Sequence, residues 1–392
     1  MLHRRFRSFI GVALLCLPCF GGQNPPSGTA PFILDNNRIY AEVTLVRPDG
    51  SLRKTLAFVD LGSPAMILSE ALFKELEINK GRPLTLNLGG MSLRVAPNAI
   101  TSDSWLPFDV ADSRKVDALL PAGVLLDYVV VINYGGRTLT VAEPGALKSA
   151  GMPVSCRVDK ATGLVAIDVS IDGRSYPVTI DSGSAYTWLR KSSVQEWLTA
   201  HPDWQQGIGA IGPSNMRMAD DGIEATGILV RIPEIKVGAL QLRQVGALGI
   251  GPSTSNWDFI DWYSQKNAVP VIGWLGGNVL RDFRLTIDYP NRMTYWQRQT
   301  EPDGTELNQV GLMLIHKSGG YFVGAIGMKN GKPTVDGVQV GDKLVQIDSL
   351  RTDGATTAAV LSALHGNPGD VRRLVLLRSG NQFNVQAKVT AF

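Results

Sequence analysis

A short pattern occurs twice in this chain and constrains its fold more than any other feature. An apolar run leads into Asp-x-Gly-Ser and is followed by a second apolar run, first around Asp60 and again around Asp181. Each copy comes after an alternating apolar stretch and an Asp-Gly pair, at residues 49–50 and 172–173. Alternation followed by Asp-Gly is typical of two antiparallel strands joined by a tight turn. The same local arrangement of strands is therefore expected at both places.

A second block repeats downstream of each acid in the same order. Residues 118–137 align without a gap with residues 273–292. The identical residues in register include Val124/Val279, Leu125/Leu280, Asp127/Asp282, Ile132/Ile287, Tyr134/Tyr289 and Arg137/Arg292. Two blocks that recur in one order indicate an internal duplication, and thus two lobes of similar fold.

The composition favours strands over helices. The 392 residues include 42 Gly and 22 Pro, and the length is sufficient for two or three domains. We therefore expect a mainly β fold, with two duplicated β lobes followed by a smaller, partly open β-barrel that carries one or two helices. The expected division is a signal peptide at 1–22, a mobile lead at 23–34, a first lobe at 37–150, a second lobe at 160–299 and a C-terminal domain at 305–392, with residues 144–160 as a connector.

Short helices are predicted after each acid, at residues 69–76 and 192–198. Each of them opens on a serine, Ser69 or Ser192, which is a residue type suited to cap a helix. A further helix is predicted at residues 355–364. A closing hairpin is predicted from residues 373–378 and 383–389.

The first residues resemble a secretory signal. Three arginines in residues 4–7 precede an apolar run, residues 9–17, that is too short to span a bilayer comfortably. We therefore expect export to the periplasm or the extracellular space. A cleaved or loosely retained signal is the main expectation. A lipid anchor at Cys19 is the alternative, against which Pro18 counts because a small residue is usual before a lipidated cysteine.

Charge and cysteine content exclude several classes of function. Without the three arginines the chain has 35 Lys and Arg against 35 Asp and Glu, and a near-neutral protein is not expected to bind nucleic acid. Cys16 and Cys19 lie in the signal, so only Cys156 remains and no intrachain disulfide is expected. The chain has only 4 His and no His-Glu-x-x-His motif, so neither a metal nor another cofactor is expected.

The two repeated acids are candidates for catalysis as a pair. Glycine after an aspartate allows close approach of another chain, and two carboxyl groups related by a pseudo-two-fold axis can share one proton. Asp60 and Asp181 would then act as general base and general acid on a water molecule. Ser63 and Ser184 are expected to hydrogen-bond the outer carboxylate oxygens. The other expected supporting residues are Gly62, Ser182 and Gly183. The alternative interpretation of each motif alone is an ordinary turn.

Residues 37–299 resemble bacterial retropepsin-like aspartic proteases in which one chain carries both lobes. The resemblance rests on Asp-x-Gly-Ser in each half, the apolar-apolar-Gly block and the Ile-Asp/Asn-Tyr-x-x-Arg strand. It implies a monomer with a cleft between two β lobes that binds a peptide or unfolded protein substrate. It also implies flexible hairpin flaps, for which residues 86–94 and 216–226 are the candidates by position.

The chain departs from the family pattern beside each acid. The family usually has Thr after each Asp, whose hydroxyls interlock beneath the pair, whereas Leu61 and Ser182 stand here. Leu61 cannot form that hydrogen bond, so different support is expected under the site. Pro121 also stands where the second copy has Gly276. The second lobe has 34 more residues between acid and block, which residues 201–227 and 253–265 can hold. The aromatic residues Trp257, Phe259, Trp262 and Tyr263 in the latter stretch are expected either to bind substrate or to pack in the core.

The C-terminal residues 307–392 resemble a PDZ domain of the type attached to bacterial proteases. The resemblance rests on Gly311, Leu312, Met313 and Leu314, and on the Gly-Asp turn of residues 337–342. It implies that the backbone amides of residues 311–314 receive a peptide C-terminus, or that an internal strand adds to the sheet edge. Attached to a protease, such a domain would recruit or position substrate.

The sequence is compatible with two other functions. The departure at Leu61 favours a peptide-binding or scaffold protein that uses the lobes and the PDZ-like domain without catalysis. A structural envelope protein that uses only the PDZ-like domain for contacts is the third alternative. Mutation of Asp60 and Asp181 separates these from the protease, which requires both acids.

Overall fold

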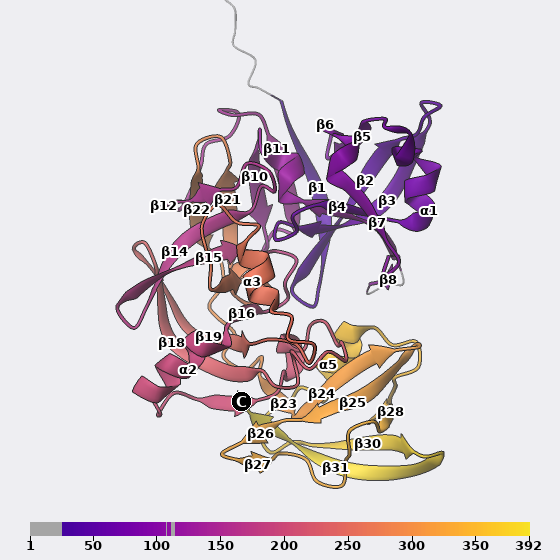
Figure 1. The fold of residues 1–392 in the computed structure, drawn as a ribbon, viewed down its shortest axis with the longest axis vertical. Helices are drawn as coiled ribbons and strands as arrows, with labels where there is room; N and C mark the ends of the chain where they lie inside the picture. The colour runs from indigo at the N-terminus through magenta and orange to yellow at the C-terminus, as the bar shows by residue number, and fades with distance from the viewer. Residues whose placement is uncertain (1–25, 107, 111–113) are drawn as a thin grey trace, which may run out of the picture.

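The computed structural model describes residues 26–106, 108–110 and 114–392, and its fold is mainly β, as the sequence predicts. The predicted signal peptide, with Cys16 and Cys19, lies outside the described residues. Strands dominate each part of the chain and the helices are short (Figure 1). Among the described residues, no helix is both long and apolar enough to cross a membrane.

The first lobe is built around the strand that carries Asp60. Its central strands lie in the order β2-β3-β9-β4-β7, with β3 parallel to β9, β9 antiparallel to β4, and β4 parallel to β7. The bounds are β2 (Arg38–Val46), β3 (Leu52–Asp60), β4 (Met66–Ser69), β7 (Ile100–Asp103) and β9 (Lys115–Pro121). Smaller strands flank them: β5 (Leu84–Leu88), β6 (Met91–Val95) and β8 (Phe108–Asp109).

The second lobe repeats this arrangement. Its strands lie in the order β14-β15-β20-β16-β19, with β15 parallel to β20, β20 antiparallel to β16, and β16 parallel to β19. The bounds are β14 (Val165–Ile171), β15 (Arg174–Ile180), β16 (Thr187–Arg190), β19 (Leu240–Ile250) and β20 (Gly273–Leu275); β13 (Arg157–Val158), β17 (Gln206–Ile208) and β18 (Ile228–Val237) extend the sheet. The same order and strand directions in both lobes agree with the internal duplication that the sequence indicates.

A sheet shared by the two lobes joins them. It has the order β12-β22-β21-β10-β11-β1. The bounds are β1 (Ser27–Asp35), β10 (Val129–Asn133), β11 (Thr138–Ala142), β12 (Met152–Ser155), β21 (Phe283–Asp288) and β22 (Met293–Arg298). At its centre β10 pairs antiparallel with β21, and Val131 lies opposite Thr286. These two residues occupy the same position of the repeat, so the pseudo-two-fold axis passes between them.

The prediction of a mobile lead is wrong, and the predicted connector between the lobes contains a strand. Residues 23–34 were expected to form a mobile lead, but β1 begins at Ser27 and pairs first with β11 and then with β2. The stretch contains Pro and Gly, but its side chains alternate between exposed and buried as in a strand. The connector at 144–160 also contains β12, which pairs with β22. Both segments are therefore ordered by pairing with strands far away in the sequence.

The predicted helices form, with one difference at a cap. Helix α1 (Glu70–Glu75) begins after Ser69, whose hydroxyl accepts a hydrogen bond from the Leu72 amide, as predicted. Helix α2 (Lys191–Ala200) begins one residue before the predicted cap at Ser192. The cap position falls on Arg190, the last residue of β16, whose side chain makes no capping hydrogen bond. Helices α3 (Phe259–Ser264) and α4 (Gly277–Leu280) complete the second lobe.

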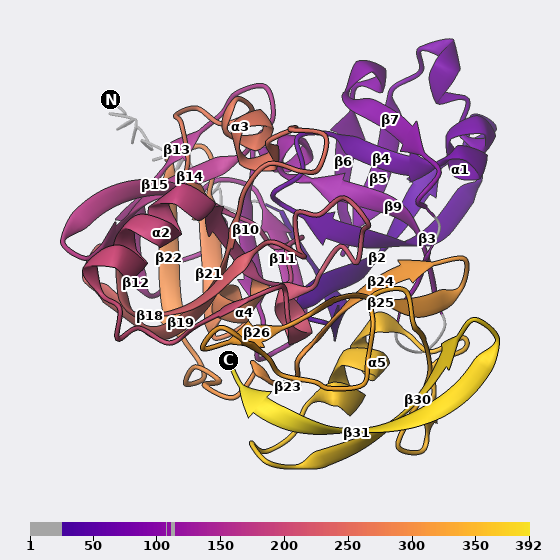
Figure 2. The ribbon, with the colours of Figure 1, turned by 60° about the horizontal axis from the view of Figure 1, so that its bottom comes forward.

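The C-terminal domain is a separate sheet with its own core. Its strand order is β23-β31-β30-β28-β25-β24, so β24 is the last strand at one edge (Figure 2). The bounds are β23 (Asn308–Val310), β24 (Leu312–Lys317), β25 (Gly320–Ile326), β28 (Lys343–Ile347), β30 (Val371–Arg378) and β31 (Asn381–Ala391). The short strand β29 (Leu350–Arg351) pairs with β28, whereas β26 (Met328–Lys329) and β27 (Lys332–Pro333) extend the sheet of the second lobe, where β26 pairs with β17. The predicted helix, α5 (Thr357–Leu364), and the predicted closing hairpin of β30 and β31 are both confirmed.

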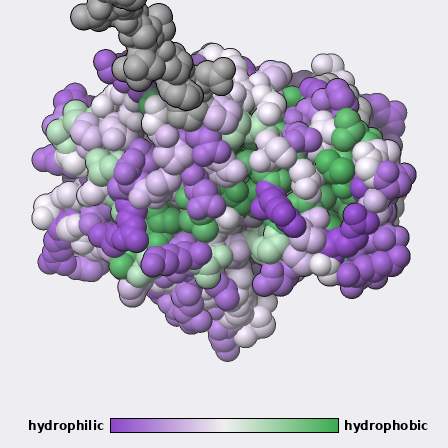
Figure 3. All heavy atoms as spheres, turned by 90° about the horizontal axis from the view of Figure 1, so that it is seen from above, coloured by the Kyte–Doolittle hydropathy of each residue, from purple (hydrophilic) through white to green (hydrophobic). Residues whose placement is uncertain are grey.

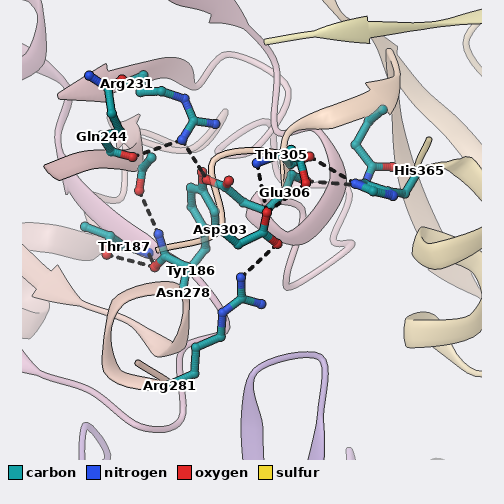
Figure 4. Close-up of polar contacts among 12 residues, drawn as sticks. Tyr186, Thr187, Arg231, Gln244, Asn278, Arg281, Asp303, Thr305, Glu306 and His365 are labelled. Atoms are coloured by element: carbon teal, nitrogen blue, oxygen red, sulfur yellow. Dashed lines mark hydrogen bonds and ion pairs between the residues drawn. The ribbon is translucent and has the colours of Figure 1, made fainter. Parts of the chain in front are cut away.

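The chain between the second lobe and the C-terminal domain is anchored at both ends (Figure 4). Arg231 of β18 forms a buried ion pair with Glu306, at 3.1 Å between Nη1 and Oε1, and the Tyr186 hydroxyl donates to the same oxygen. Arg281 pairs with Asp303 at 3.0 Å. On the other side, the Thr305 carbonyl lies 3.0 Å from Nε2 of His365. These contacts bind the domain junction to the second lobe.

The C-terminal domain also packs on the second lobe through apolar side chains. Met313 and Ile315 of β24 and Phe392 are buried in one cluster with Ile211 and Ile223 of the second lobe. Leu312 and Leu314, which alternate with them, are buried in the core of the C-terminal domain. Hence β24 is buried on both faces.

On the face of the molecule drawn in Figure 3, hydrophobic residues gather in the middle and hydrophilic residues surround them.

Removal of Glu306 is expected to destabilise the protein strongly. Glu306→Ala leaves the Arg231 guanidinium buried without a counter-charge, and the side chains of both residues are only 6% exposed. A broken buried pair typically costs about 3 kcal/mol or more in the free energy of unfolding. Urea denaturation of wild type and variant measures it.

The matched control is Glu196→Ala, which removes an exposed partner of Arg174. Exposed pairs contribute little, so a loss of less than about 0.5 kcal/mol is expected there. Equal losses for the two variants would contradict the role given to the junction.

Candidate active site

The two repeated acids lie at equivalent ends of equivalent strands. Asp60 is the last residue of β3, and Asp181 directly follows β15. Asp60 lies beside Pro121 of the parallel strand β9, and the Asp181 amide donates to the carbonyl of Leu275 in the parallel strand β20. Each acid thus lies at the end of its strand, beside a parallel neighbouring strand and at the boundary between the lobes.

The structure brings the two carboxyl groups together. A β-carbon on Gly62 would overlap the carboxyl group of Asp181, and a β-carbon on Gly183 would overlap that of Asp60. Each glycine of the repeated motif therefore gives room to the acid of the other lobe. Each acid also shifts the pKa of the other, which agrees with their close approach. The predicted pair is thus formed by contacts that cross between the lobes.

Backbone amides hold the inner oxygens of both acids. The Gly62 amide donates to Oδ1 of Asp60 at 2.9 Å, and the Gly183 amide donates to Oδ1 of Asp181 at 2.9 Å. The Ser184 amide also donates to Oδ1 of Asp181, at 3.1 Å. These bonds fix the carboxyl groups in one orientation without a mobile side chain.

One hydroxyl, that of Ser182, supports the site in place of the two interlocking hydroxyls that the resemblance implies. Its hydroxyl accepts from the Leu61 amide at 3.0 Å and donates to the Val59 carbonyl at 2.9 Å, so it ties the second lobe to the strand end that carries Asp60. The Leu61 side chain is buried in the apolar core instead. The sequence correctly predicts that the support differs, but does not predict that one hydroxyl makes both bonds.

The predicted roles of Ser63 and Ser184 are wrong. Their hydroxyls do not reach the carboxyl groups but donate to backbone carbonyls two residues further on, those of Ala65 and Tyr186. The Ser184 hydroxyl also accepts from Nε1 of Trp274, at 2.6 Å. Both serines therefore close the turn after the acid, and both also line the cleft.

Burial and mutual repulsion make the pair resist losing its last proton. Burial raises the pKa of Asp60 above its ordinary value, against the amide hydrogen bond from Gly62. Burial raises the pKa of Asp181 well above its ordinary value, and the negative charge of Asp60 raises it further. Asp181 is 8% exposed and Asp60 is half-buried. One proton shared by the pair is the arrangement that these shifts indicate.

A cleft of about 1180 Å³ opens above the pair. Aromatic residues of both lobes line it: Phe58, Trp105 and Phe108 from the first lobe, and Phe259, Trp262, Tyr263 and Trp274 from the second. The 253–265 stretch therefore contributes to the cleft wall as well as to packing. At one end the cleft is lined by His316, Tyr321 and residues 354–357 of the C-terminal domain.

The first predicted flap does not cover the cleft. Residues 86–94 do form a hairpin, β5 with β6, but the cleft lining contains none of them. Strand β5 pairs with β2, and a β-carbon on Gly89 at the hairpin turn would meet the backbone of β1. The hairpin therefore packs on its own lobe. Residues 103, 105 and 108–109, which precede β9, line the cleft instead.

The second predicted flap lies at the cleft but is not a hairpin. Met216, Arg217 and Ala219 line the cleft, and residues 216–226 form irregular turns. The fully buried Glu224 carboxylate accepts from the amides of Arg217 and Ala219, at 2.9 and 3.4 Å. This segment is consequently held from behind by its own loop.

Arg38 is a site residue that sequence reasoning missed. Its Nε donates to the Gly183 carbonyl at 2.9 Å and its Nη2 to the Met216 carbonyl at 3.2 Å, and its charge lowers the pKa of Asp60. It is the first residue of β2, which carries no motif, so only the tertiary fold brings it to the acids. Trp274 was within the repeated block, but nothing there indicated its contact with Ser184.

The PDZ-like residues lie on and beside β24. A β-carbon on Gly311 would overlap the Thr334 side chain, and Leu312 and Leu314 belong to the domain core. Met313 faces the second lobe. The Leu314 amide, one of the predicted carboxylate-binding groups, donates to Oδ1 of Asn215 in the second lobe.

Within residues 26–106, 108–110 and 114–392, no three His, Cys, Asp or Glu side chains gather in a way that could hold a metal ion. A scan against protein-family models finds no match to this chain, and a search of curated proteins gives no significant match. The site is therefore interpreted from its own geometry.

Loss of the Ser182 hydroxyl is expected to weaken the connection between the lobes. Ser182→Ala leaves the Leu61 amide and the Val59 carbonyl without their shared partner, at a residue that is fully buried. Buried unpaired groups of this kind cost about 2 kcal/mol in the free energy of unfolding. Ser182→Thr retains a hydroxyl and is the control; equal losses for both variants would contradict the bonding described.

The acid pair is expected to make stability fall with rising pH. Because folding raises the pKa of both carboxyl groups, the folded protein binds more protons than the unfolded chain above pH about 4, the ordinary aspartate pKa. The free energy of unfolding then decreases as pH rises through that window. Asp181→Asn removes this effect, so its stability relative to wild type should increase from pH 4 to pH 7.

Asp342 gives a control of opposite sign. Hydrogen bonds from Arg378 lower the pKa of Asp342 in the folded protein. The ionised carboxylate therefore stabilises the folded protein above the pKa of the unfolded chain, and this stabilisation is lost as pH falls through the folded-state pKa. Asp342→Asn should therefore lose stability relative to wild type at neutral pH. A constant difference between Asp181→Asn and wild type across pH 4 to 7 would contradict the raised pKa values.

Proposed function

We propose that this protein is an aspartic endopeptidase of the retropepsin-like kind, in which Asp60 and Asp181 activate one water molecule. The observation that carries the proposal is the mutual contact of the two acids across the lobe boundary, where each motif glycine makes room for the opposite carboxyl group. Two acids that share a proton supply a base and an acid at one point, which is what hydrolysis of an amide requires.

The chemistry follows from the protonation of the pair. The ionised carboxylate, assigned to Asp60, takes a proton from the water as its oxygen bonds to the peptide carbonyl carbon. The protonated carboxyl, assigned to Asp181, gives its proton to the carbonyl oxygen, so that a neutral gem-diol forms. The C–N bond then breaks as a hydroxyl of the diol returns a proton to Asp181 and Asp60 protonates the leaving nitrogen.

The cleft favours peptides with large apolar side chains near the cleaved bond. Phe58, Trp105 and Phe108 face it from one lobe, and Phe259 and Trp262 from the other. Trp105 and Trp262 remain 42% and 37% exposed, so they have apolar surface that a substrate can cover. Unfolded proteins and flexible peptides present such side chains in extended conformation.

Other parts of the proposal depend on the resemblance drawn from the sequence. Export to the periplasm or extracellular space, and a role of the C-terminal domain in handling peptides, are proposed on that basis. The alternative function is a peptide-binding protein without catalysis. It is favoured by the single cross-lobe hydroxyl at Ser182, because Leu61 supplies none.

Conservative replacement of either acid is expected to abolish proteolysis. Asp60→Asn and Asp181→Asn preserve size but remove the base or the shared proton, and a loss of about 1000-fold or more in kcat/KM is expected. Cleavage of casein by residues 23–392 between pH 3 and 8, with and without a statine inhibitor, measures it.

Asp127→Asn is the matched control, because Asp127 belongs to the repeated block but is exposed. It should retain activity. Activity that survives in both acid variants would contradict the dyad, and a folded wild type that cuts no substrate at any pH would favour the peptide-binding alternative.

A further inference from the structure

Part of the second lobe covers the edge strand of the C-terminal sheet. Strand β24 is the edge strand of its sheet, and two of its alternate residues donate their amides away from it. The Leu314 amide donates to Oδ1 of Asn215 at 2.7 Å, and the His316 amide donates to the Met218 carbonyl at 3.0 Å. A peptide that added to this edge as a strand would need these same two donors.

The occupying segment also fills an apolar site of the C-terminal domain. The Met218 side chain is 3% exposed and lies in the core cluster of that domain rather than in that of its own lobe. The members of this cluster on β24 and α5 are Leu312, Leu314, Val360, Leu361 and Leu364. Residues 212–214, which lead into the segment, pack against α5. Residues 215–218 therefore have the backbone acceptor and the apolar side chain of a bound peptide.

The backbone of the segment is held in an unfavourable conformation at the contact. Met218 has a φ of +50°, in the left-handed region that non-glycine residues rarely adopt. Such a conformation persists only where the surroundings stabilise it. Here the surroundings are the His316 amide and the apolar cluster of the neighbouring domain, so the contact with the C-terminal domain maintains the shape of the segment.

The other side of the same segment forms the wall of the cleft. Met216 and Arg217 line the cleft between the contact residues Asn215 and Met218. The Met216 sulfur lies 3.0 Å from the Ser184 hydroxyl, and its carbonyl accepts from Arg38. Arg38 in turn donates to the Gly183 carbonyl, beside the acids. Within a few residues the segment thus contacts both the C-terminal sheet edge and the surroundings of the acid pair.

We propose that residues 215–218 are an internal ligand of the C-terminal domain, and that an extended peptide which binds the β24 edge displaces them and thereby rearranges the cleft wall. The C-terminal domain is then a control element of the cleft, and it binds peptides only in exchange for this segment. The incoming peptide must offer a backbone carbonyl to the His316 amide and an unbranched or aliphatic side chain to the site of Met218. The effect on peptide cleavage rests on the proposed function, whereas the exchange itself does not.

The exchange can be measured by peptide binding. The probe is a fluorescein-labelled peptide that copies residues 211–219, added to the full chain with Asp181→Asn so that the peptide stays intact. Because the tethered segment competes at high effective concentration, Met218→Ala, which weakens the competitor, should bind the probe about tenfold more tightly. Asn215→Ala, which removes the other contact, should bind it more tightly as well, and serves if Met218→Ala does not fold by near-ultraviolet circular dichroism.

Hydrogen exchange gives a second readout on the same proteins. Saturation with the probe should speed exchange of the Arg217 and Ala219 amides, which leave Glu224 when the segment moves. The Leu314 and His316 amides should stay protected, because the probe replaces the segment. Met152→Ala, at an exposed methionine of β12, is the control and should bind as the parent does.

Equal affinity of the probe for the parent and both segment variants, including no binding to any of them, would overturn the proposal. Unchanged exchange of residues 215–219 at saturation would also overturn it, because the probe would then bind without displacing the segment. Neither readout needs peptide hydrolysis, so the result is distinct from success or failure of the proposed protease activity.

Discussion

The close approach of the carboxyl groups of Asp60 and Asp181 at the pseudo-two-fold axis is the constraint on which the structure depends. The groups repel each other when both are ionised, so the fold must supply energy to hold them together or retain a proton between them. Amide donors from Gly62 and Gly183, the Ser182 hydroxyl and the β10–β21 pairing all act at or near the axis. These contacts keep the two carboxyl groups together.

Features that depend on local pattern could be predicted from the sequence. Examples are the two strand ends with their acids, the Ser69 cap and the duplication. Each depends on a few neighbouring residues or on a pattern that repeats in register. Features that depend on distant pairing were not predictable. The 86–94 hairpin is predicted correctly, but it does not cover the cleft as expected, because the pairing of β5 with β2 decides where it packs. The direction of the Ser63 hydroxyl depended likewise on how tightly its turn closes.

The C-terminal domain is integrated with the two β lobes more closely than its sequence implies. A PDZ-like pattern predicts a free edge for peptide ligands, but β24 has one face in the apolar contact with the second lobe and its edge amides bonded to Asn215 and Met218. The buried Arg231–Glu306 pair fixes the junction as well. A domain held in this way lines part of the cleft, and contacts through Met216 and Arg38 connect its edge with the surroundings of the acids.

The central claim, that the two lobes create one proton-sharing pair, can be tested directly by nuclear magnetic resonance. The chain would be labelled with ¹³C at the aspartate carboxyl carbons, and the signals of Asp60 and Asp181 would be assigned with the Asn variants and followed from pH 2 to 9. We predict two well-separated titration steps, with both carbons responding in each step and the second step above the ordinary aspartate range. Two independent titrations, each near pH 4, would contradict it.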